Sequence, residues 1–72
     1  MYKYRVAESV ANGKTVYHGE FDNENDAKCC AKTLVAKTHN TCFIQRYNGE
    51  KWQEGSVMYL WMFEHVCFYN RW

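Results

Sequence analysis

A β-hairpin is predicted by YKYRVAESVANGKTVYHGEF, residues 2–21. Asn12-Gly13 is its strongest turn signal, because both central residues of a type I′ turn need positive φ. A two-residue turn there predicts the cross-strand pairs Tyr4–Phe21, Arg5–Glu20, Val6–Gly19 and Glu8–Tyr17. One face of the hairpin would then carry its large apolar side chains, Tyr4, Val6, Val10, Tyr17 and Phe21. Gly19 would let a helix approach this face closely.

An amphipathic helix is predicted over residues 22–38. Asp22 or Asn23 can cap its first turn, and Asn40 can end it in the left-handed conformation. Its apolar positions repeat at helical spacing and form one stripe: Ala27, Cys30, Ala31, Leu34 and Val35. Because two members of this stripe are alanines, we expect the helix to lie close to its sheet.

A second hairpin is predicted over residues 41–54, around Asn48-Gly49. A two-residue turn there pairs Tyr47 with Glu50 and Gln45 with Trp52. One face would carry Cys42 and Ile44, and the opposite face Phe43, Tyr47 and Trp52. A single helix can cover only one of these faces, so the other is exposed or buried by a different element.

Residues 56–72, SVMYLWMFEHVCFYNRW, have mixed propensities. Ser56 is a fair N-cap and the methionines favour helix, while the aromatic residues favour strand. No Gly, Pro or Asn-Gly interrupts residues 56–69, which argues against a tight hairpin. We expect a helix, with a long bent strand as the alternative. Because the segment is apolar nearly all round, it is expected to lie between two surfaces, the second belonging to another chain.

These elements predict an α+β fold in one domain, residues 1–72. A small antiparallel sheet in ββαββ order would carry one packed helix and the C-terminal apolar element. The chain has 72 residues, 47% of them hydrophobic, and a net charge of +1. This composition excludes intrinsic disorder, and the low charge argues against a protein that coats nucleic acid.

We expect a cytoplasmic protein with no membrane association. Residues 1–5 lack the apolar core of a signal peptide, and the longest apolar run, residues 57–63, is too short to span a bilayer. Cys29 and Cys30 are adjacent within the predicted helix, a poor layout for a disulfide framework. All four cysteines, Cys29, Cys30, Cys42 and Cys67, are therefore expected to be free thiols in a reducing compartment.

No pattern in the sequence predicts a catalytic site, a metal or a cofactor. His39 and Cys42 have a spacing found at zinc sites, but the Cys-x-x-Cys pair usual in structural zinc sites is missing. Cys29 lies near Lys28 and Lys32, which could lower its pKa, but no base is placed beside it by sequence. We therefore expect no enzyme, with Cys30 and Cys42 as core residues.

Binding through aromatic side chains is the favoured function. Three Trp, six Tyr and four Phe exceed what one small core can enclose, and Trp and Tyr dominate interaction hot spots. We expect the partner to be a protein, bound through Phe43, Tyr47, Trp52, Trp61 and Trp72. Self-association through residues 56–72 is compatible with this. The alternative is single-stranded nucleic acid, whose bases would stack on Phe43, Tyr47 and Trp52, with Arg46 and Lys51 on the opposite face of the hairpin.

The layout resembles that of a loose class of very small phage-encoded proteins. The shared features are a hairpin ending in Gly-Glu-Phe-Asp, a helix containing Asp-Ala-Lys, and a strand followed by Tyr-Asn-Gly-Glu-Lys-Trp, within residues 2–54. Some members inhibit host or defence machinery, including anti-CRISPR proteins with one helix on an antiparallel sheet. The resemblance implies a stoichiometric inhibitor of a bacterial complex that works without turnover. It assigns no functional residue.

Overall fold

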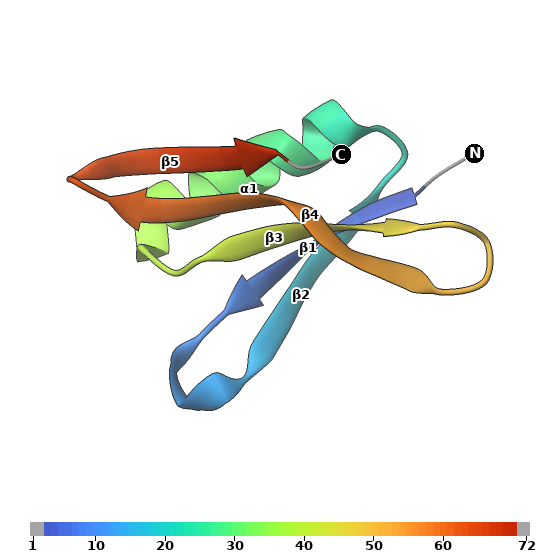
Figure 1. Ribbon diagram of the computed structural model, residues 1–72, viewed down its shortest axis with the longest axis horizontal. Coiled ribbons are helices and arrows are strands. Elements are labelled where there is room, and N and C mark those ends of the chain that lie inside the picture. Colours follow the sequence, from blue (N-terminus) through green and yellow to red (C-terminus); the bar gives the residue numbers. More distant parts are fainter. Residues whose placement is uncertain (1–2, 71–72) are drawn as a thin grey trace.

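The computed structural model describes residues 3–70, except for the side chains of residues 54–56. Five strands form one antiparallel sheet in the order β2-β1-β3-β4-β5, and one helix packs on it (Figure 1). The elements in chain order are β1 (Lys3–Ser9), a 3-10 turn (Ala11–Gly13), β2 (Thr15–Phe21), α1 (Glu24–Thr38), β3 (Cys42–Tyr47), β4 (Trp52–Met62) and β5 (His65–Asn70). The predicted α+β fold with an antiparallel sheet is confirmed.

The ends of α1 follow from local hydrogen bonds. The Asn23 side chain accepts a hydrogen bond from the Asp26 amide at 2.8 Å, so it is the N-cap, one of the two predicted. At the other end, His39 adopts the left-handed conformation with φ 63°, and its amide donates to the Val35 carbonyl at 2.8 Å. The helix thus ends at Thr38, as predicted, but the left-handed residue is His39 and not the predicted Asn40.

The hydrophobic core lies between α1 and one face of the sheet. Ala27, Ala31 and Val35 of the predicted stripe are buried, and Cys30 and Leu34 pack at its margin. Opposite them, the sheet contributes Val6, Cys42, Ile44, Val57 and Tyr59. The small alanine side chains let the helix lie close to strands that carry branched aliphatic residues.

The first hairpin has a different register from the one predicted. Its loop holds three residues, Ala11–Gly13, and the Val10 amide donates to the Lys14 carbonyl at 3.0 Å. Val6 therefore faces His18 instead of Gly19. An extra residue in β2 at Gly19-Glu20 then restores the predicted Tyr4–Phe21 pair, and the positive φ of Gly19, 60°, suits such a bulge. Gly19 is exposed, and the helix does not pack against it.

That one-residue difference moves Tyr17 to the other face of the sheet. Successive side chains of a strand point to opposite faces, so a shift of one residue reverses them. Tyr17 faces Ala7 and is 51% exposed, on the face away from α1. Its predicted place beside Tyr4 and Val6 was wrong, because an Asn-Gly pair also fits a three-residue loop.

The second hairpin is shifted by two residues, so the predicted faces are correct. Tyr47 pairs with Trp52 instead of Glu50, across a loop of residues 48–51. The Asn48 side chain organises this loop by accepting hydrogen bonds from the amides of Glu50 and Lys51, at 2.9 and 3.1 Å. Cys42 and Ile44 are buried beneath α1, while Phe43, Tyr47 and Trp52 lie on the opposite face.

The C-terminal segment forms strands, so the predicted helix was wrong. Residues 57–62 pair with residues 65–70 in a tight hairpin, which gives the order ββαβββ instead of ββαββ. The turn residues Phe63 and Glu64 both adopt positive φ, 54° and 63°, in a conformation normally taken by Asn or Gly. Propensity did not signal this turn. Pairing of β4 with β3 instead supports the strand conformation.

Candidate functional site

The sheet has one covered face and one open face. Helix α1 contacts all five strands from the same side, and Figure 1 shows it running along that side only. Within residues 3–70, no element packs on the opposite side, which we call the open face. Strand alternation and pairing place its large side chains: Tyr17, Phe43, Tyr47, Trp52, Met58, Leu60, Met62 and Tyr69. All of them are half-buried or exposed.

Arg5 of β1 lies on the open face between two aromatic rings. Its guanidinium carbon lies 3.9 Å from the centroid of the Tyr17 ring and 4.3 Å from that of Trp52. Its Nε–H donates a 2.7 Å hydrogen bond to Oε1 of Gln45, a residue directly across the strand pair. The rings and the hydrogen bond hold the arginine in one orientation, which lowers the entropy lost when a ligand binds.

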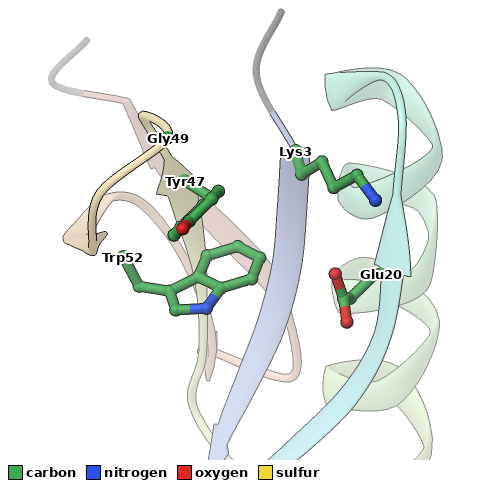
Figure 2. Close-up of a pocket in the computed structure, with 5 residues that line it drawn as sticks. All are labelled: Lys3, Glu20, Tyr47, Gly49 and Trp52. Atoms are coloured by element: carbon green, nitrogen blue, oxygen red, sulfur yellow. The ribbon is translucent and has the colours of Figure 1, made fainter.

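A shallow pocket of about 420 Å³ opens beside this arginine. It is lined by Lys3, Glu20, Tyr47, Gly49 and Trp52, and Figure 2 shows the two aromatic side chains across β1 from the two charged ones. The Tyr47 and Trp52 rings are tilted by 46°, with centroids 5.2 Å apart. A side chain of another molecule that entered this pocket would contact the two aromatic rings. Polar groups beside that side chain would lie near one positive and one negative charge, those of Lys3 and Glu20.

The predicted partner-binding residues are divided between the two faces. Phe43, Tyr47 and Trp52 lie together on the open face. Trp61 lies on the covered face, where its ring stacks on His39 at 4.0 Å between centroids and 7° between planes. Trp72 lies outside the described residues.

Several open-face residues were missing from the predicted site. Tyr17 was missed because the hairpin register was wrong, and Met58, Leu60 and Met62 because a helix was expected there. Arg5 was placed on the correct face, but its contact with Trp52 joins β1 to the tip of a distant hairpin. No short-range pattern could have predicted that contact.

A polar cluster ties the covered face to the end of α1. The buried Glu8 carboxylate accepts hydrogen bonds from Asn40 Nδ2 at 2.8 Å and lies 2.7 Å from His18 Nε2. The hydrogen bond from Asn40 lowers the Glu8 pKa from 4.5 more than burial raises it, and His18 lowers it further. Since the carboxylate is fully engaged by its neighbours, the cluster serves to join β1, β2 and the helix end.

The four cysteines are free thiols in different surroundings. Burial, with the charges of Glu8 and Cys30, raises the pKa of Cys42 to about 12, so this thiol stays protonated near neutral pH. Cys29 is exposed on α1, and Cys67 lies 3.6 Å from His65 Nε2 near the tip of the β4–β5 hairpin. Within residues 3–70, no three His, Cys, Asp or Glu side chains are grouped to hold a metal ion.

Comparison with known proteins adds no assignment. No family model, curated protein or solved structure matches the chain. None of the helices within residues 3–70 combines the length and apolar character needed to cross a bilayer.

Proposed function

We propose that the protein is a non-catalytic interaction module whose open face binds a partner protein. The observation that carries the proposal is the contrast between the large apolar side chains of this face and the absence of any described element packed on it. Aromatic and thioether side chains left uncovered on a small domain are typical of interaction surfaces. Phe43, Tyr47 and Trp52 of the expected binding residues lie on this face, and Tyr17 and Met62 enlarge it.

The pocket beside Trp52 is the proposed anchoring point. Its aromatic wall can enclose an apolar side chain of the partner, while Lys3 and Glu20 can pair with polar groups around that side chain (Figure 2). A central buried anchor with a polar rim is the usual arrangement of a tight interface. Because Arg5 is already held by Tyr17, Trp52 and Gln45, the surface needs little rearrangement to bind.

The proposed biological role is that of a phage-type stoichiometric inhibitor acting on a bacterial host or defence complex. The resemblance of layout over residues 2–54 motivates this role, and the single-layer antiparallel sheet with one helix agrees with it. Such a protein would block a surface of its target without turnover, so it needs no catalytic group or cofactor. Its site of action would be the bacterial cytoplasm, whose reducing conditions suit four free thiols.

Affinity purification from bacterial lysate tests the proposal when three tagged proteins are compared, each with and without nuclease. The wild type and Lys32→Ala, a control on the exposed side of α1, are expected to retain the same discrete protein. Trp52→Ala is expected to lose it. Retention by Trp52→Ala with loss in Lys32→Ala would contradict the proposal, because the binding surface would then lie on the helix side.

Single-stranded nucleic acid is the second candidate. The observation that favours it is the position of Lys3 and Arg5 beside Tyr47 and Trp52, since bases stack on aromatic rings flanked by positive charge. Fluorescence anisotropy with labelled oligonucleotides separates the two candidates. Nucleic-acid binding would fall steeply as salt is raised, and purification would yield nuclease-sensitive absorbance instead of a protein.

A further inference from the structure

The two edge strands of the sheet differ in how they are protected. A strand edge exposes unpaired backbone groups that can template pairing with another chain, and proteins block such edges with bulges and charges. The edge strand β2 has both, a bulge at Gly19 and the carboxylate of Glu20. The opposite edge strand, β5, spans His65–Asn70 and contains no Lys, Arg, Asp or Glu.

The geometry of the β4–β5 hairpin determines which groups of β5 face outward. Met62 and His65 flank a two-residue turn and form the first hydrogen-bonded pair, and hydrogen-bonded pairs then alternate along an antiparallel ladder. Cys67 and Tyr69 therefore direct their backbone groups toward β4. The N–H and C=O groups of Val66 and Phe68 point to the outer edge.

Phe68 combines outward-facing backbone groups with a half-exposed aromatic side chain. It lies on the covered face at the margin of α1, is 47% exposed, and contacts Tyr59 with ring centroids 4.9 Å apart. The Lys28 ammonium lies 5.6 Å from the centroid of the Phe68 ring and 3.4 Å from a Glu24 carboxylate oxygen. The edge thus presents an outward-facing backbone, an aromatic ring and one charge of each sign.

We propose that two copies of the chain associate through β5, paired antiparallel around a two-fold axis at Phe68. In this arrangement Phe68 of each copy faces Phe68 of the other, and the outward N–H and C=O groups of the two residues bond to each other. A two-fold axis brings identical residues together, and β5 tolerates this because it carries no charge that would be repelled. Near the axis, Glu24 of one copy can pair with Lys28 of the other.

The product is one continuous sheet of ten strands, five from each copy. Because the axis is perpendicular to the sheet, both α1 helices lie on one side and both open faces on the other. Tyr69, half exposed in one copy, would be covered by Cys67 of the second. The association does not rest on what the open face binds, and it leaves Tyr17 and Trp52 accessible.

Light scattering coupled to size-exclusion chromatography tests this dimer over a range of concentrations. The wild type is expected to show twice the mass of the chain, falling toward one chain on dilution. Phe68→Lys is expected to show a single chain at every concentration, since two lysines would face each other on the axis. Val16→Lys, at a similarly exposed position on edge strand β2 (42% against 47% for Phe68), is the matched control and is expected to stay dimeric.

A mixture of two variants tests the register. Phe68→Lys and Phe68→Glu are each expected to be monomeric, and the mixture to regain the dimer mass, because opposite charges then meet at the axis. A wild type that stays monomeric, a Phe68→Lys dimer, or a mixture that stays monomeric would overturn the proposal.

Amide hydrogen exchange of the wild type keeps the test independent of the folding of any variant. The Phe68 amide is expected to gain protection as concentration rises, while the Cys67 and Tyr69 amides, which face β4, stay protected throughout. A Phe68 amide that exchanges equally fast at all concentrations would contradict the pairing.

Discussion

The two faces of the sheet differ in how far their side chains are covered. On the covered face, Val6, Ile44 and Val57 are fully buried against a helix that contributes two alanines and a valine. On the open face, Tyr17 and Met62 remain 51% and 38% exposed. The centre of the covered face holds small branched residues packed under the helix, with Trp61 and Phe68 at its margin, whereas the open face holds large flat or flexible side chains that no described element covers. Substitutions on the covered face should therefore mainly lower the free energy of unfolding, and substitutions on the open face should mainly lower the affinity for a partner.

The largest effect on stability is expected for Ile44→Ala, at the centre of the covered face. Ile44 has no exposed surface, so truncation removes its buried methyl groups and leaves a cavity. The free energy of unfolding should fall by about 2–5 kcal/mol. Urea denaturation measures this loss. An effect as small as that of Phe63→Ala, a control at the 80% exposed hairpin tip, would mean that Ile44 is not part of a packed core.

The next effect is expected from Glu8→Gln, which changes the polar part of the covered face. The side-chain amide of glutamine has one oxygen in place of the two that meet Asn40 and His18, so the free energy of unfolding should fall by about 1–3 kcal/mol at neutral pH.

The Glu8 carboxylate also predicts a pH dependence. Its folded-state pKa lies below 4.5, so its stabilisation is present above that pH and is lost as the pH falls through the folded value. Denaturation at a series of pH values should show the wild type losing more stability in acid than Glu8→Gln. Parallel pH profiles for the two proteins would contradict this assignment.

A smaller effect of opposite sign is expected at the β4–β5 turn, which belongs to neither face. Phe63 and Glu64 both adopt a left-handed conformation that L-residues resist. Replacing both, Phe63→Asn with Glu64→Gly, should raise the free energy of unfolding by about 1 kcal/mol, since this pair favours positive φ. An increase in the thermal midpoint checks the prediction, and a decrease would mean that the native side chains stabilise the turn by contacts of their own.

A loss of stability of similar size is expected for Trp52→Ala on the open face. The variant loses the ring contacts with Tyr47 and Arg5, at a cost of about 1 kcal/mol. Affinity for the protein captured from lysate should nevertheless fall by roughly tenfold or more. Denaturation and titration calorimetry measure the two quantities. A large loss of stability with unchanged affinity would assign Trp52 to the core.

The covered face was more predictable from sequence than the open face. The helical stripe and the placement of Cys42 and Ile44 needed only local periodicity, and the two-residue error at Asn48-Gly49 left side chains on their predicted faces. The one-residue error at Asn12-Gly13 moved Tyr17 across the sheet. The strand conformation of residues 57–70 depends on pairing with β3 and on a turn without glycine, so tertiary contacts decided it.

The central claim, that the open face is the binding surface, can be tested by oxidative footprinting of the protein with its captured partner. Met58, Met62 and Trp52 oxidise readily and lie on the open face, and mass spectrometry reports each of them separately. The account predicts that the partner protects these three residues and leaves the oxidation of Cys29, exposed on α1, unchanged. Protection of Cys29 with undiminished oxidation of Met62 and Trp52 would contradict it.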